Sequence, residues 1–194
     1  AIINQLQIES CKVFSGSSSV EFFHKNKIEA QNVYSPPRFD VIDGKLEKSL
    51  KWLWSYYKYY KICKEVSSKI INDEKPELII SDEDFASIAI AQKRKIPNII
   101  ITDILETKFT SGFGGMVEKK MNKTMCEMLN KANMVIIPEF GKNENNIIRT
   151  GPIVRKIQKN RDELRNILGF KKKTIIISVG GTDAGIFLIK QTIE

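Results

Sequence analysis

Short runs of β-branched and other apolar residues alternate along this chain with longer segments of mixed polarity, and turn residues stand at the junctions. The runs that fit buried strands are 11–16, 77–82, 98–103, 134–138, 147–152 and 174–179. Strand-length runs separated by helical segments are typical of parallel strands joined by crossover helices. The order of segments therefore predicts an α/β fold with a parallel sheet.

The segments between these runs carry helix signals. Serines can cap a helix over 17–27, and acids at the start of 82–96 suit a helix N-terminus. Longer helices are expected over 46–72, which stops shortly before Pro76, and over 116–132.

Composition restricts the partners. The chain has 194 residues, and this length is enough for one α/β domain and part of a second. With 42% hydrophobic and 28% charged residues, its composition is that of a globular protein. A net charge of +8 favours a polyanion or an anionic membrane surface. Because the lysines are spread over the expected helix exteriors, a solvated surface is favoured over a nucleic-acid groove.

The residues that usually hold metals are scattered. Cys11, Cys63 and Cys126 are far apart in the sequence, and His24 has no cysteine or second histidine near it. This spacing predicts neither a disulfide framework nor a metal site, and it suits a reducing cytoplasm. We expect His24 on the surface of a short helix.

Polar residues end most of the expected strands, where an open parallel sheet binds its ligands. They are Ser15 and Gly16, then Ser81 to Asp84, then Thr102 and Asp103, then Pro138 and Glu139, and finally Gly180, Gly181 and Thr182. Asp82 and Asp103 end neighbouring strands, so both are expected to border one cleft. Glu83 and Asp84 fit general bases or helix caps, and capping is favoured.

Two further segments suit ligand contact. Gly180, Gly181 and Thr182 lie between a strand and a helix, where backbone NH groups and a hydroxyl can hold a diphosphate, although no Walker or dinucleotide pattern is present. The segment 48–66 mixes tryptophans and tyrosines with lysines. Its aromatic face can pack on the sheet, meet a bilayer or lipid acceptor, or stack on nucleic-acid bases.

Taken together, the segments "PELIISDEDFASIAIAQKRKIPNIIITD", "IIRTGPIVRKI" and "TIIISVGGTDAG" resemble the two-domain GT-B glycosyltransferases. Within this fold the chain resembles the family 28-like transferases that add N-acetylglucosamine to lipid-linked muramoyl-pentapeptide, and their uncharacterised bacterial and archaeal relatives. The resemblance implies a Rossmann-like acceptor domain over 1–150 that lacks its first strand. It also implies an interdomain linker and helix over 151–173, with Gly151 and Pro152 as the hinge, and the first βα unit of a nucleotide-sugar domain over 174–194.

The resemblance also implies site residues. Gly180, Gly181 and Thr182 would contact the donor diphosphate, whereas Ser15, Gly16, Asp82 and Asp103 would face the acceptor. Asp103 takes a catalytic role at a place where the family has a histidine-led cluster. The main catalytic histidine is expected before Ala1 and the rest of the donor domain after Glu194, so the fragment alone is expected to be inactive.

The implied function is transfer of a hexose from a nucleoside diphosphate sugar, a UDP-sugar above all, to the hydroxyl of a lipid-linked or other glycan acceptor. Neither a cofactor nor a metal is required. The implied place is the cytoplasm, at the inner face of the membrane. Two alternatives stay open: a nucleotide-sugar hydrolase of the same fold, and a non-catalytic module that binds membrane or nucleic acid.

Overall fold

The computed structural model describes residues 11–38, 41–42, 45–46, 49–108, 112–154, 158–175 and 189–191. Its elements, in chain order, are β1 (Val13–Gly16), α1 (Ser17–Lys25), β2 (Ala30–Tyr34), β3 (Val41–Ile42), β4 (Lys45–Leu46), α2 (Ser49–Glu74), β5 (Ile79–Asp82), α3 (Phe85–Lys93), β6 (Asn98–Ile101), α4 (Gly112–Lys131), β7 (Met134–Ile137), β8 (Ile147–Arg149) and α5 (Arg161–Ile167).

Parallel strand pairing dominates the fold. A four-stranded sheet has the order β5-β6-β7-β8, and all of its strands are parallel. A separate parallel pair, β1-β2, is connected through α1, whereas β3 and β4 form a short antiparallel pair. The predicted α/β class with a parallel, Rossmann-like arrangement is confirmed.

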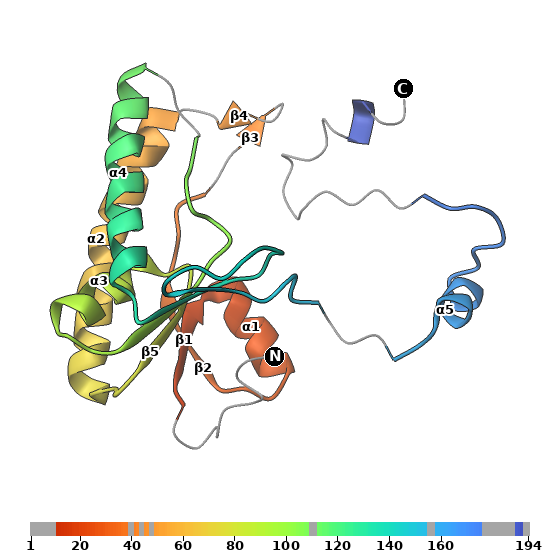
Figure 1. Cartoon of the computed structure of the whole chain (residues 1–194), viewed down its shortest axis with the longest axis horizontal. Coiled ribbons are helices and arrows are strands. Elements are labelled where there is room, and N and C mark those ends of the chain that lie inside the picture. The colour runs from red at the N-terminus through yellow and green to blue at the C-terminus, as the bar shows by residue number, and fades with distance from the viewer. Residues whose placement is uncertain are drawn as a thin grey trace.

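Helices lie on both sides of the strands. Figure 1 shows α2, α3 and α4 gathered on one side of the strands and α1 on the other. The core lies between α3, α4 and the four-stranded sheet, where Ile88, Ile100, Val135 and Ile137 are fully buried. Removal of these aliphatic side chains from water is the main force that holds the helices to the sheet.

Five of the six predicted strand runs contain observed strands. Strands were found within 11–16, 77–82, 98–103, 134–138 and 147–152. The run 174–179 lies largely outside the described residues, so the expected first βα unit of a second domain stays a prediction. The sequence analysis missed β2 and the short β3-β4 pair.

The helix predictions differ mainly at their ends. Helix α2 begins at Ser49 and continues to Glu74, two residues beyond the expected end. Helix α4 begins at Gly112, four residues before the expected start at 116, so the glycines that precede Met116 belong to its first turn. Helix α5 starts with a capping box between Asn160 and Glu163, and none of its residues is buried.

Candidate functional site

A tight acidic turn joins β5 to α3. The buried Ser81 hydroxyl accepts from the backbone NH of Asp84 at 3.0 Å and donates to the Asp84 carbonyl at 2.9 Å. Glu83, between them, has a left-handed backbone with a φ of 59°. This conformation is uncommon for a residue with a side chain. Because of it, the Glu83 and Asp84 side chains point in different directions.

Asp84 links three elements. Its carboxylate Oδ1 accepts from the backbone NH groups of Ala86 and Ser87, which caps α3. Its Oδ2 accepts from the Tyr34 hydroxyl of β2 at 2.9 Å, and that hydroxyl oxygen lies 3.0 Å from Ser67 Oγ of α2. The capping role expected for Asp84 is confirmed, and the same carboxylate holds β2 to the start of α3.

Glu83 faces a different partner. Partial burial, a hydrogen bond with the Asp103 carboxyl group and the negative charges of Asp103 and Asp82 together raise the pKa of Glu83 from 4.5 to about 7. The pKa of Asp82 is also raised, first by burial and then by the charge of Asp103. The capping role expected for Glu83 was wrong: Asp84 caps α3, whereas the Glu83 carboxyl group interacts with Asp103 and has Asp82 next to it.

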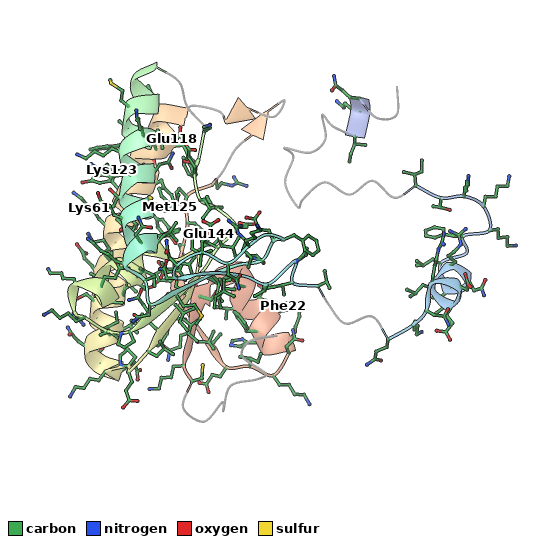
Figure 2. All side chains as sticks on the ribbon, in the orientation of Figure 1. Phe22, Lys61, Glu118, Lys123, Met125 and Glu144 are labelled. Atoms are coloured by element: carbon green, nitrogen blue, oxygen red, sulfur yellow. The ribbon has the colours of Figure 1, made fainter. Side chains whose placement is uncertain are left out.

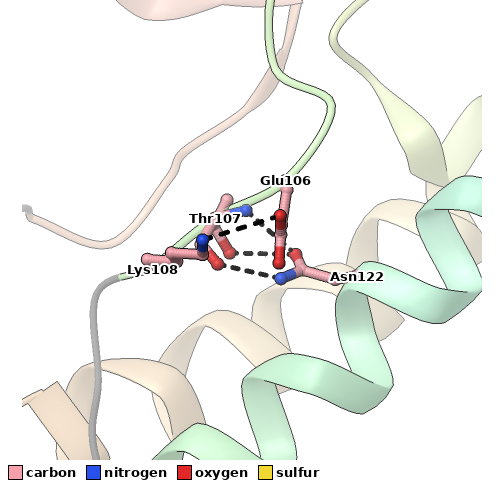
Figure 3. A network of polar contacts seen from close by, with 4 residues as sticks. All are labelled: Glu106, Thr107, Lys108 and Asn122. Carbon is pink, nitrogen blue, oxygen red and sulfur yellow. Dashed lines mark hydrogen bonds and ion pairs between the residues drawn. The ribbon is translucent and has the colours of Figure 1, made fainter.

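The segment after β6 is held in place on both sides of Asp103. Thr102 is buried, and its Oγ1 accepts from the backbone NH of Ile104 at 3.0 Å. Further along, the Asn122 side chain of α4 accepts from the Thr107 NH and hydroxyl and donates to the Thr107 carbonyl at 2.8 Å (Figure 3). These contacts fix the backbone that carries Asp103 beside the acidic turn.

A cavity of about 140 Å³ opens at this edge of the sheet. Its lining residues are Tyr34, Tyr56, Tyr59, Tyr60, Asp82, Glu83, Asp84, Phe85 and Ala86. A larger, more open hollow of about 310 Å³ lies near Pro97 and Asn98, at the opposite end of β6. Ligands of parallel sheets bind at the carboxyl ends of the strands, which favours the acidic cavity as the functional one.

Helix α2 divides its aromatic residues between two surfaces. Tyr56, Tyr59 and Tyr60 line the cavity. By contrast, Trp54 is 60% and Tyr57 44% exposed. Their outer neighbours are cationic: Lys58 Nζ lies 5.5 Å from the Trp54 ring centroid and Lys61 Nζ lies 4.7 Å from that of Tyr57. Figure 2 shows Lys61 at the outer margin of the helices.

The remaining predicted site residues fall in different places. Gly16 is the last residue of β1 and the N-cap of α1, and a Cβ atom at this position would lie 3.2 Å from the Tyr34 carbonyl oxygen. Ser15 and Gly16 thus lie beside the strand that supplies Tyr34. Gly151 has a left-handed φ of 73°, and Pro152 is exposed. Gly180, Gly181 and Thr182 lie outside the described residues, and their diphosphate-binding role stays a prediction.

The described part of the chain contains neither a metal-binding cluster nor a membrane-spanning helix. Among the described residues, no group of three or more His, Cys, Asp or Glu side chains is placed to hold a metal ion. His24 is exposed on α1, as expected, and its Nε2 lies 3.1 Å from the Ala30 carbonyl. No described helix has the length and apolar character needed to cross a bilayer.

Sequence reasoning missed Tyr34 and misjudged Glu83. The available signal for Tyr34 was in "EAQNVYSPP", where a β-branched residue and an aromatic residue come shortly before two prolines. For Glu83, the sequence showed only a row of acids. Which acid caps α3 and which faces Asp103 depends on the left-handed backbone at Glu83, and sequence periodicity carries no information about it.

A search against protein-family models finds no match for this chain. Among solved structures, MurG from Acinetobacter baumannii aligns with a TM-score of 0.47 and 11% sequence identity. The alignment covers 81% of this chain and 41% of the MurG chain. This chain therefore spans less than half the length of that neighbour.

Proposed function

We propose that this chain is the acceptor-binding part of a glycosyltransferase, in which Asp103 and Glu83 together act as the general base. The observation that carries the proposal is the carboxyl pair itself. It lies at the carboxyl ends of β5 and β6, next to a cavity, and the pKa of Glu83 is raised to about 7. A base with a pKa near the working pH is suited to proton transfer.

The proposed reaction displaces a nucleoside diphosphate from the anomeric carbon of a sugar. The acceptor hydroxyl oxygen forms the new bond to that carbon as the carbon–oxygen bond to the diphosphate breaks. The hydroxyl proton passes to a carboxylate oxygen of the Asp103–Glu83 pair, and the diphosphate leaves with the bonding electrons. The resemblance of the sequence to GT-B transferases supports a UDP-sugar donor held by Gly180, Gly181 and Thr182, and a lipid-linked acceptor held beside Ser15, Gly16 and Asp82.

The outer face of α2 supports a location at an anionic membrane surface. Trp54 and Tyr57 are exposed there, with Lys58 and Lys61 next to their rings. Aromatic rings favour the interfacial region of a bilayer, while lysines are attracted to anionic headgroups. The cavity tyrosines belong to the same helix, so such contact would bring a lipid-linked acceptor close to the carboxyl pair.

The test uses the full-length protein with UDP-sugars, in the presence and absence of polyprenyl-linked acceptors. Product formation is expected only with acceptor, and Asp103→Asn is expected to lower kcat by about 100-fold or more. Glu77→Gln is the matched control, because Glu77 is exposed and precedes β5 at the other end of the strand.

Two results would replace the proposal. Release of UDP and free sugar at a rate that acceptor leaves unchanged would identify a hydrolase. No affinity for any nucleotide sugar, together with salt-sensitive binding to vesicles or oligonucleotides, would identify a binding module.

A further inference from the structure

The cavity beside the carboxyl pair has one aromatic wall and one acidic wall. We propose that it binds an organic ammonium group, either a protonated amine or a quaternary ammonium. The inference rests on the proposed function only in one respect, namely that the ammonium group belongs to the glycosyl acceptor. Binding of the cation itself does not depend on glycosyl transfer.

The aromatic wall comes mainly from one helix. Tyr56, Tyr59 and Tyr60 occupy positions i, i+3 and i+4 of α2, so they lie on one face of the helix. The Tyr56 and Tyr59 ring centroids are 6.2 Å apart with an interplanar angle of 52°, and Tyr56 stacks on Trp52 at 5.1 Å. Tyr34 extends the wall from β2. Tilted rings around one hollow form the kind of cage that attracts cations to aromatic faces.

One ring of this wall already receives a cation from the protein. Lys64 Nζ lies 5.5 Å from the Tyr60 ring centroid. All the tyrosines of the wall remain neutral under ordinary conditions, because burial is the first cause that raises their pKa values. The rings therefore keep the neutral aromatic character on which cation–π attraction depends.

The acidic wall is made by Asp82, Glu83 and Asp84, which come from the end of β5 and the turn before α3. The ion pairs recorded within the described residues are Lys12 with Glu74, Lys108 with Glu106 and Arg149 with Glu139, so none of them neutralises this wall. In a chain with a net charge of +8, this leaves a local negative region next to the aromatic rings.

The chemistry of the two walls favours a cation over a neutral sugar ring. Aromatic rings can cover the apolar face of either ligand. Only a cation also gains from the acidic wall, and it offsets the repulsion from Asp103 that, after burial, raises the pKa values of Asp82 and Glu83. An ammonium group seated here would place an acceptor hydroxyl on a neighbouring carbon within reach of the Asp103–Glu83 pair.

The direct test compares choline with its neutral isostere 3,3-dimethyl-1-butanol, by titration calorimetry on the full-length protein. Choline is expected to bind about tenfold more tightly or better. Tyr56→Leu and Tyr60→Leu are each expected to weaken choline binding about fivefold, and Asp82→Asn with Glu83→Gln about tenfold. Phe22→Leu, an exposed change on α1, and Glu77→Gln are expected to leave it unchanged.

Equal affinity for choline and the neutral alcohol, or no binding of choline, would overturn the inference. So would equal losses in the cavity variants and the controls. Circular dichroism spectra confirm that each variant is folded before titration, and the two tyrosine variants provide independent tests. The transfer assay runs in parallel: transfer without choline binding removes only the ammonium site, whereas choline binding without transfer removes only the proposed reaction.

Discussion

Glu83 and Asp84 are neighbours in the acidic turn, but their side chains make different contacts. Asp84 is committed to the fold, because its two carboxylate oxygens are occupied by the start of α3 and by Tyr34. Glu83 does not cap α3, and its carboxyl group faces Asp103 instead. The left-handed backbone at Glu83 accompanies this difference between the acid that caps α3 and the acid that faces Asp103.

The raised pKa of Glu83 predicts a pH-dependent stability. The group has a pKa of 4.5 when free and about 7 in the fold, so the folded protein binds more protons than the unfolded chain between these values. The free energy of unfolding should therefore fall as the pH rises through this window. Urea denaturation across the window is expected to show this fall in the wild type and a shallower one in Glu83→Gln. Parallel curves for the two proteins would contradict it.

The Tyr34 hydroxyl supports a second prediction. Tyr34→Phe leaves Asp84 Oδ2 and Ser67 without their partner at a site where Ser67 is 2% exposed. Loss of a partner for buried polar groups costs about 1–3 kcal/mol of unfolding free energy. Urea denaturation measures it, with Tyr57→Phe on the exposed face of α2 as the control. A variant as stable as the control would show that the network contributes nothing.

Among the elements, α2 has the least uniform surroundings. Leu53, Cys63, Ser67 and Ile71 are buried, the cavity tyrosines are partly buried, and Trp54 and Tyr57 are exposed. The sequence analysis left open whether the aromatic residues pack inward or face a partner. The structure shows partly buried and exposed aromatic residues on the same helix, because they lie on more than one of its faces.

The central strand β6 provides the prediction for the sheet. Ile100 is fully buried between neighbouring strands and helices, so Ile100→Ala leaves a cavity and is expected to cost about 2–5 kcal/mol of unfolding free energy. Ile80→Ala in β5 is the matched control, because Ile80 is 38% exposed. Thermal or urea unfolding measures both. Similar losses in the two variants would mean that the core does not lie where the structure places it.

Secondary structure was predictable wherever local pattern decides it. The runs around β5, β6 and β7 are apolar and bounded by turn residues, and the cap at Asp84 follows from its position before an apolar helix. Strand β2 was missed because "AQNVY" contains polar residues and pairs only at the β1 side among the described strands. The contact of Glu83 with Asp103 could not be predicted from the sequence. The two residues follow different strands, and their contact depends on the backbone conformation at Glu83, which hydrophobic periodicity does not encode.

For the molecule as a whole, the net charge of +8 and the outer face of α2 predict binding to anionic vesicles. Each lysine near such a surface contributes about 1 kcal/mol, so Lys58→Gln with Lys61→Gln should weaken binding about 30-fold. Sedimentation with phosphatidylserine vesicles measures the change. The control, Lys25→Gln with Lys27→Gln, removes the same charge around the end of α1. Equal losses in the two pairs would indicate a general charge effect and contradict a dedicated face.

The sequential order β5-β6-β7-β8 also bears on how the protein is made. Each strand pairs with the one that precedes it in the chain, so every addition to this sheet needs only residues that the ribosome has already released. The sheet can therefore grow in the direction of synthesis, with β8 as its final strand. During translation, the acidic turn and Asp103 can come together before the segment with Gly180 and Gly181 has left the exit tunnel.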